Sequence, residues 1–198
     1  MSATFQRTSA SAGPRDREGI LRATIDQLAA QGYQRLTVEG VAATARVHKS
    51  TLYRWWPDKS ALVADALAGH LATGPVPDTG TTRGDLIAWL RVTIANYTAT
   101  PAGVAMPALI SDLSSRPGGL AAFRESFLDK RRAGCEILVR RGITRGDLSA
   151  DIDIELFMDA LAGTVFYRQL VSGQPITDDL AERIVALLGV PRCTNSSA

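Results

Sequence analysis

The chain has 198 residues, of which 45% are hydrophobic and 21% charged, a composition typical of a folded globular protein rather than a disordered one. No apolar run approaches the roughly 18 residues that a membrane span requires, so we expect no membrane partner. The net charge is +2, but residues 1–60 hold nine Lys and Arg against five Asp and Glu. This asymmetry favours a polyanionic partner for the N-terminal part.

Residues 1–15 are rich in Ser and Ala and lack the apolar centre of a signal peptide, so we expect a flexible tail on a cytoplasmic protein. Cys135 and Cys193 are too far apart for a Cys-x-x-Cys motif, and the two histidines have no neighbouring ligand residues. We therefore expect neither a metal nor a cofactor. Cys135 is interpreted as a buried, inert thiol, with a redox sensor as the alternative.

Four helices are predicted in the N-terminal third from apolar residues at helical spacing. They cover residues 16–31, about 38–45, about 50–56 and about 59–71. Gly32 is suited to end the first helix, and Thr37 and Asp58 are suited to cap the second and fourth. Pro57 stops the third helix because proline disfavours helical geometry in the residue before it.

Residues 72–82 are rich in Pro, Gly and Thr, and are predicted to form a linker. Five further helices are expected, over residues of about 82–100, 102–115, 117–141, 154–172 and 178–188. The third of these is expected to end at Gly142, where Arg140 and Arg141 meet the negative end of the helix. No segment favours a β-strand over a helix, so the sequence predicts an all-α fold of about nine helices.

The second and third helices, joined by a tight turn, form a helix-turn-helix pattern. A recognition helix must be slim and polar at its N-terminus to reach base edges in a major groove about 12 Å wide. Leu52 and Trp56 lie four residues apart and are predicted to anchor the helix to the core. Trp55 then points about 100° away, toward a partner.

The residues around this pattern resemble the tetracycline-repressor (TetR) family of bacterial transcription regulators. The family pattern is V-x-K-x-T-L-Y-x-x-F-x-x-K, and this chain matches it with Val47, Lys49, Thr51, Leu52, Tyr53, Trp56 and Lys59. Three residues depart from it. Arg46 replaces a usual glycine, Trp56 a usual phenylalanine, and His48 a usual serine or threonine, which is expected to shift operator preference.

The resemblance implies that double-stranded operator DNA is bound by residues 16–71, with the helix-turn-helix at the centre. The implied contacts are Lys49, Ser50, Thr51, Tyr53, Arg54 and Trp55. We add Arg46 as a further charge, and Thr37 and Lys59 as phosphate contacts at the N-termini of the second and fourth helices. For His48, base contact and a role in starting the helix remain equally open, and Tyr53, Lys49 and Lys59 have solvated surface roles as alternatives.

The resemblance also implies that residues 83–190 form a domain for effector binding and dimerisation, followed by a tail over 191–198. The last two helices would pair with their copies in a homodimer, through Phe157, Leu161, Val165, Ile184, Leu187 and Leu188. An unknown small molecule would bind among the first four of these five helices, beside Trp89, Tyr97, Met106, Ile110, Phe123, Phe127 and Tyr167. Few charges interrupt these helix faces, so we expect a largely apolar effector, although ordinary core packing is the alternative for each residue.

Two other classes of function stay open at this point. A helical enzyme is disfavoured because the chain contains no Gly-x-Ser-x-Gly, Walker or dinucleotide-binding motif, and we expect no catalytic residues. A helical binding or architectural protein without an effector would have a solid C-terminal core. The sequence therefore favours a ligand-responsive repressor.

Overall fold

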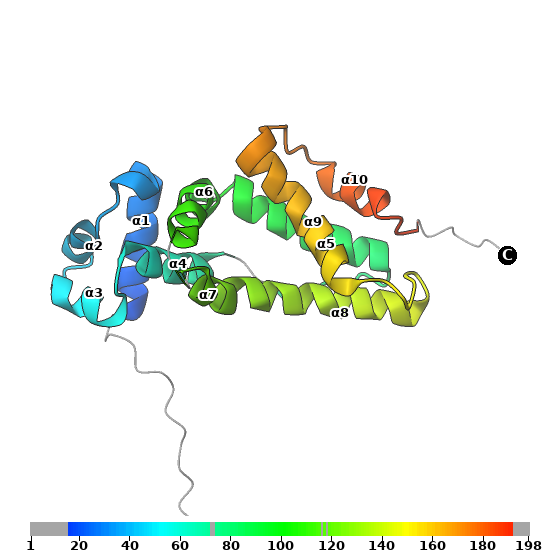
Figure 1. Ribbon diagram of the computed structural model, residues 1–198, viewed down its shortest axis with the longest axis horizontal. Coiled ribbons are helices and arrows are strands. Elements are labelled where there is room, and N and C mark those ends of the chain that lie inside the picture. The colour runs from blue at the N-terminus through cyan, green and yellow to red at the C-terminus, as the bar shows by residue number, and fades with distance from the viewer. Residues whose placement is uncertain (1–15, 72–73, 116, 118, 192–198) are drawn as a thin grey trace, which may run out of the picture.

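The computed structural model describes residues 16–71, 74–115, 117 and 119–191, and these form helices and no strand (Figure 1). The predicted all-α fold is confirmed. Apart from Pro191, both predicted tails lie outside the described residues, as do residues 72–73 of the predicted linker. None of the helices in the described part of the chain is long and apolar enough to cross a membrane.

The N-terminal helices are α1 (Arg17–Arg35), α2 (Val38–Thr44), α3 (Lys49–Trp55) and α4 (Lys59–His70). Side-chain caps fix where α2 and α4 begin: Thr37 Oγ1 accepts from Gly40 N at 3.1 Å, and Asp58 Oδ1 accepts from Ala61 N at 2.9 Å. Both predicted caps are confirmed. Helical geometry in α1 breaks at Gly32, whose φ of 74° directs the chain toward α2.

The remaining helices divide into two groups. Helices α6 (Pro101–Ser114) and α7 (Gly119–Phe123) lie against the N-terminal helices, with α6 packed on α1 and α4. Helices α5 (Thr82–Thr98), α8 (Asp129–Arg145), α9 (Ile154–Tyr167) and α10 (Leu180–Leu187) form the far end of the molecule (Figure 1). We call α1–α4 the head, and α5, α8, α9 and α10 the body.

Asp112 of α6 joins the head to the rest of the molecule. Its Oδ2 accepts from the Tyr33 hydroxyl at 2.5 Å and from the Ser60 hydroxyl at 2.6 Å. Tyr33 closes α1 and Ser60 lies in the first turn of α4, so one carboxylate holds two helices of the head on α6.

The helix over residues 117–141 was predicted to end at Gly142, and this end is wrong. It is interrupted by a π-helical turn, η1 (Arg124–Leu128), and α8 continues past Gly142 to Arg145. Gly142 is buried inside α8, where a Cβ would lie 2.6 Å from Thr82 Cγ2, so this glycine allows close helix approach. The helix ends instead at Gly146, whose φ of 79° is the left-handed conformation that glycine adopts without strain.

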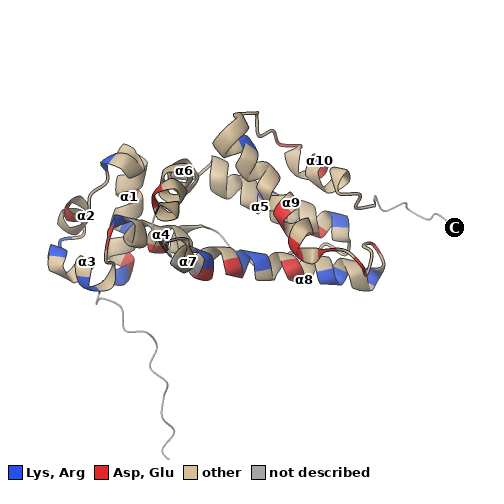
Figure 2. Cartoon of the chain, in the orientation of Figure 1, with Lys and Arg blue, Asp and Glu red and all other residues tan. Residues whose placement is uncertain are grey.

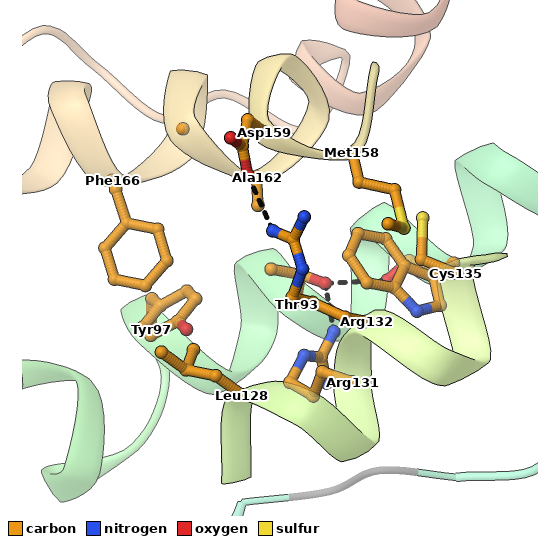
Figure 3. Close-up of a pocket in the computed structure, with 12 residues that line it drawn as sticks. Thr93, Tyr97, Leu128, Arg131, Arg132, Cys135, Met158, Asp159, Ala162 and Phe166 are labelled. Atoms are coloured by element: carbon orange, nitrogen blue, oxygen red, sulfur yellow. Dashed lines mark hydrogen bonds and ion pairs between the residues drawn. The ribbon is translucent and has the colours of Figure 1, made fainter. Parts of the chain in front are cut away.

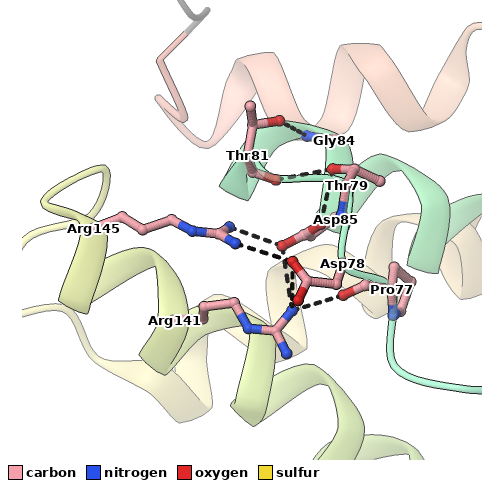
Figure 4. Close-up of polar contacts among 8 residues, drawn as sticks. All are labelled: Pro77, Asp78, Thr79, Thr81, Gly84, Asp85, Arg141 and Arg145. Carbon is pink, nitrogen blue, oxygen red and sulfur yellow. Dashed lines mark hydrogen bonds and ion pairs between the residues drawn. The ribbon is translucent and has the colours of Figure 1, made fainter.

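A polar cluster ties the linker to both α5 and α8 (Figure 4). The fully buried carboxylate of Asp85 accepts from Thr79 N at 2.6 Å, from Thr79 Oγ1 at 2.8 Å and from Arg145 at 2.9 Å. Arg141 donates to the Pro77 carbonyl at 2.8 Å. Burial alone would raise the pKa of Asp85, but the hydrogen bonds from Thr79 and Arg145 outweigh it and lower the pKa.

Candidate DNA-binding surface and effector pocket

Helix α3 has one anchored face and one exposed face. Leu52 is fully buried and Trp56 is 6% exposed, with its Nε1 donating to Asp65 Oδ2 at 2.9 Å. Trp55 and Tyr53 are 40% and 46% exposed. The two adjacent tryptophans therefore point as the sequence predicts, one into the head and the other out of it.

The turn between α2 and α3 contains Arg46 with a φ of 56°, a left-handed conformation in which glycine is the usual residue. Two hydrogen bonds close this turn: Val47 N donates to the Ala42 carbonyl at 3.0 Å and Arg46 N to the Ala43 carbonyl at 3.2 Å. This is the Schellman arrangement, with Arg46 in the position that favours glycine. The chain therefore keeps the tight turn at some cost in backbone strain.

Helix α3 lies at the end of the molecule farthest from α10 (Figure 2), and most of the predicted DNA contacts in and just before it are exposed. Six of them join Trp55 there, with Thr51 half-buried beside them: Arg46, His48, Lys49, Ser50, Tyr53 and Arg54. The Arg54 guanidinium lies 5.8 Å from the centroid of the Trp55 ring. The surface thus combines basic groups, hydroxyls and an aromatic ring at the start and outer side of one short helix.

Tyr53 is linked to the preceding helix. Its hydroxyl donates to Glu39 Oε1 at 3.3 Å, and partial desolvation together with the Glu39 carboxylate raises the pKa of the phenol. Tyr53 is therefore a neutral hydrogen-bonding group at pH 7.

Two predicted phosphate contacts have roles inside the head. The Lys59 ammonium donates to the Tyr33 carbonyl at 3.1 Å and lies 4.4 Å from the centroid of the Tyr33 ring. The Thr37 hydroxyl caps α2. Both residues remain at helix N-termini, but their side chains already stabilise the head.

A cavity of about 300 Å³ lies in the body between α5, α8 and α9 (Figure 3). Its wall is largely apolar, with Trp89 and Tyr97 from α5, Leu128 from η1, and Met158 and Phe166 from α9. The remaining lining residues are Thr93, Arg131, Arg132, Cys135, Asp159, Ala162 and Gly163. A cavity of this size and polarity is within the range of small-molecule sites.

The two arginines of the pocket have different surroundings. Arg132 forms ion pairs with Asp159, at 2.6 Å, and with Glu155. Arg131 is only 8% exposed; it donates to Thr93 Oγ1 and its Cζ lies 4.8 Å from the centroid of the Trp89 ring. Cys135 beside them is buried, and burial raises the pKa of its thiol to about 12. This agrees with an inert thiol.

The outer face of α9 and of the π-helical turn that follows it, η2 (Arg168–Ser172), carries exposed apolar side chains. Leu156, Tyr167 and Val171 are 65%, 60% and 69% exposed, and Leu187 of the neighbouring α10 is 80% exposed. Gly163 is exposed between Leu156 and Tyr167. These five residues form what we call the α9–α10 face.

Two family models match this chain, one over its N-terminal region and one over its C-terminal region. Residues 20–66 match the model of bacterial regulatory proteins of the tetR family, and residues 76–188 match the tetracyclin repressor-like C-terminal domain. The chain belongs to the TetR family. It is a transcriptional regulator with a helix-turn-helix DNA-binding domain.

Its TetR relatives align over most of their length. The chain is 31% identical to the uncharacterized HTH-type transcriptional regulator YdeS of Bacillus subtilis, over 87% of this chain and 88% of that protein. It is 30% identical to a DNA-binding transcriptional repressor TetR of Mycobacteroides abscessus, over 84% and 87%. The crystal structure of the TetR regulator SCO0332 superposes with a TM-score of 0.73 at 33% identity, covering 89% of this chain and 98% of that chain.

The predicted effector residues of this TetR protein are only partly brought together. Trp89 and Tyr97 line the cavity, whereas five others do not: Met106, Ile110, Phe123, Phe127 and Tyr167. The first two belong to α6, which packs on the head, and the two phenylalanines are buried in the core. Tyr167 points outward because it follows Phe166, the residue of α9 that faces the cavity.

The predicted dimer residues also need correction. Four of the six are buried within the single chain and so cannot form a surface for a second one: Phe157, Leu161, Val165 and Ile184. Leu187 is exposed and Leu188 half-buried. The periodicity of α9 reveals an apolar arc, but burial shows which part of it covers the body and which part stays open.

Proposed function

We propose that this TetR protein is a cytoplasmic repressor that binds a pseudo-palindromic operator as a homodimer and releases it when a small effector enters the body. The observation that carries the proposal is the geometry of α3. Its buried Leu52 and Trp56 hold the helix rigidly, while its N-terminal residues and Trp55 face outward. An exposed, slim and anchored helix is what the major groove accepts.

Two copies of α3 would enter successive major grooves about 34–36 Å apart, or a multiple of that distance. In this mode Lys49, Ser50 and Thr51 reach base edges from the start of the helix. Tyr53, Arg54 and Trp55 contact the backbone beside the groove, and Arg46 adds a phosphate contact from the turn. Binding led by phosphates weakens steeply with salt.

The α9–α10 face supports the homodimer. Leu156, Tyr167, Val171 and Leu187 leave large apolar side chains in water, and such a set is covered when a second copy presents the same set across a two-fold axis. The exposed Gly163 has no Cβ and lets the two α9 helices approach closely.

The cavity in the body supports effector control. It disfavours the alternative of a helical binding or architectural protein, which would have a solid C-terminal core. Its walls come from α5, α8 and α9, and α8 is tied to the linker through Arg141 and Arg145. A ligand that favours a spacing of the two heads unsuited to DNA would lower operator affinity roughly 5- to 150-fold, for a coupling of about 1–3 kcal/mol.

Genomic fragments bound by the purified protein provide the test of DNA recognition. A selected duplex is titrated by fluorescence anisotropy, and log Kd is expected to rise linearly with log salt. Lys49→Ala and Thr51→Ala should each abolish the preference for the selected sequence over a scrambled one. Lys130→Ala removes the same charge from an exposed position on α8 and should leave the preference intact. Selectivity that survives both α3 changes would contradict the placement of the recognition helix.

The dimer is tested separately by sedimentation at micromolar concentration. Tyr167→Arg is expected to give monomers and weak operator binding because it places two like charges in the interface. Ile137→Arg, at a comparably exposed apolar position on α8, is the matched control and should remain dimeric. A wild-type chain that sediments as a monomer would contradict this part of the proposal.

A further inference from the structure

The cavity in the body is open on one side, and its lining residues show which side this is. Of the 12 residues that line it, the two exposed ones are Asp159 and Gly163, which lie four residues apart on α9. The other ten are half-buried or buried. The mouth of the cavity therefore lies along α9.

One part of this mouth is bridged by the chain itself. The Arg132 guanidinium reaches from α8 to α9, where it pairs with Asp159 at 2.6 Å and with Glu155. Further along α9, Gly163 has no side chain to cover the cavity, and nothing in the chain lies within 4 Å of a Cβ added there. The single chain therefore leaves the mouth open at Gly163.

The same stretch of α9 belongs to the α9–α10 face. Leu156, Gly163 and Tyr167 are spaced by seven and four residues, which puts them on one side of a helix. Asp159 lies three residues after Leu156 and four before Gly163, so it shares this side. Leu156 and Tyr167 are exposed before and after the mouth along the helix. A molecule that covers both of these side chains must also lie over the mouth.

A second copy of this chain fits this surface. The proposed mode of operator binding needs two α3 helices, and α3 lies at the end of the molecule farthest from α10 (Figure 2). Pairing through the α9–α10 face therefore leaves both recognition helices open. A two-fold axis brings the same face of each copy together, and the missing Cβ of Gly163 lets the backbone of the second α9 approach the mouth closely.

We propose that the cavity is a site shared by two subunits: α9 of the second copy lies over Asp159 and Gly163 and forms the wall that one chain lacks. A molecule bound in the cavity then contacts both subunits. It binds the dimer more tightly than the monomer, and by linkage it stabilises the dimer to the same extent. This inference rests on the proposed function and makes its homodimer and its effector cavity parts of one site.

The thiol of Cys135 reports whether the mouth is covered, because Cys135 lines the cavity. A Cys193→Ser parent protein retains Cys135 as its single thiol. Its reaction with methyl methanethiosulfonate is followed by mass spectrometry at fixed pH, since the rate of such exchange depends on access to the sulfur. Dilution of the parent from dimer to monomer, followed by sedimentation, is expected to raise the rate by about tenfold or more.

Leu187→Arg makes the same comparison at one concentration. Leu187 is 80% exposed on α10 and does not line the cavity, so this variant should be a monomer with unchanged cavity residues. Cys135 should react about tenfold faster in it. Tyr167→Arg replaces it if Leu187→Arg still sediments as a dimer. Val104→Arg, at a 75% exposed apolar position on α6, is the matched control and should keep the dimer and the slow rate. Circular dichroism melts check that each variant is folded.

A neutral probe tests the site from the side of the ligand. N-phenyl-1-naphthylamine fluoresces more strongly in apolar surroundings, and it should bind the parent dimer about fivefold or more tightly than the monomeric variant. The Val104→Arg dimer should bind it as the parent does.

Three results would overturn the shared site: equal Cys135 rates in dimer and monomer, probe binding that is no tighter to the dimer, or no probe binding to either. Sedimentation and operator titration separate this failure from that of the proposed function. A dimer that binds its operator but leaves Cys135 as reactive as in the monomer keeps the repressor and removes only the shared site. A parent protein that sediments as a monomer at micromolar concentration removes the proposed dimer, and the shared site with it.

Discussion

The head and the body of this protein use aromatic residues in opposite ways. In the head, Trp55 and Trp56 are neighbours at the end of one short helix, and the direction of each side chain follows from helix spacing and the position of Leu52. In the body, the aromatic residues of the cavity come from two separate helices, α5 and α9, and whether an aromatic side chain lines the cavity or fills the core depends on how the helices pack. A surface made by one helix can be predicted from local sequence, whereas a cavity among several helices cannot.

The largest effect is expected from breaking the division of roles between the two tryptophans. Trp56→Ala removes a buried ring and its hydrogen bond to Asp65, and should lower the free energy of unfolding by about 3–5 kcal/mol. Trp55→Ala should change it by no more than about 0.5 kcal/mol, as at other surface positions, yet weaken operator binding. Urea denaturation and anisotropy titration measure the two effects, and equal destabilisation by both changes would contradict the division.

A second large effect is expected at the polar cluster that joins the linker to the body. Asp85→Asn replaces the buried carboxylate that lies 3.6 Å from Arg141 and 2.9 Å from Arg145 with a neutral amide, and should cost about 3 kcal/mol of unfolding free energy. Asp78, which pairs with the same arginines, is exposed, and Asp78→Asn should cost at most about 1 kcal/mol. Urea denaturation of the three proteins at pH 7 measures both costs.

The stability difference between the wild type and Asp85→Asn depends on pH, and the lowered pKa of Asp85 sets the sign of this dependence. The carboxylate stabilises the fold fully above its unfolded pKa of about 3.9, and this contribution is lost as the pH falls through the lower folded pKa. The stability difference between wild type and Asp85→Asn should therefore be constant from pH 7 to about pH 5 and shrink below about pH 4. A difference that grows on acidification would show that another group provides the stabilisation.

The same contrast explains which sequence predictions succeeded. Thr37 and Asp58 cap their helices as predicted because a cap depends on residues three positions away, and Leu52 and Trp56 share a face because they are four apart. The helix end predicted at Gly142 was wrong, because the sequence around this glycine suits a helix end while its real constraint is the Thr82 side chain of another helix. Arg131 was missed as a pocket residue for the same reason: an arginine in a basic helix carries no local sign that it points at Trp89.

A third prediction tests whether Gly142 serves packing. In Gly142→Ala the new Cβ would lie 2.6 Å from Thr82 Cγ2, and we expect a loss of about 1–3 kcal/mol despite the higher helix propensity of alanine. Gly163→Ala in α9 is the matched control, because nothing lies within 4 Å of its Cβ in the single chain. That change should raise monomer stability by up to about 1 kcal/mol and weaken the proposed dimer. Thermal unfolding and sedimentation distinguish the two effects, and a stabilising Gly142→Ala would restore the interpretation of Gly142 as a helix end.

The smallest expected effect is at Arg46, which occupies a left-handed turn position that favours glycine. Its left-handed φ of 56° costs about 1–2 kcal/mol in a residue with a Cβ, and Arg46→Gly removes this cost while adding chain entropy to the unfolded state. The net gain in unfolding free energy should be at most about 1 kcal/mol, measured by urea denaturation. Arg46→Ala keeps the Cβ and should show no gain.

The same two variants separate strain from charge. If Arg46 contacts a phosphate, both changes should weaken binding to every duplex by a similar factor and reduce the slope of log Kd against log salt by about 1. A change in binding by Arg46→Gly alone would mean that the turn matters through its shape, because Arg46→Ala keeps the Cβ and the same strained turn. An unchanged salt slope in both variants would mean that the chain keeps its strained arginine for a reason other than DNA, and would move the basic surface of the head entirely onto α3.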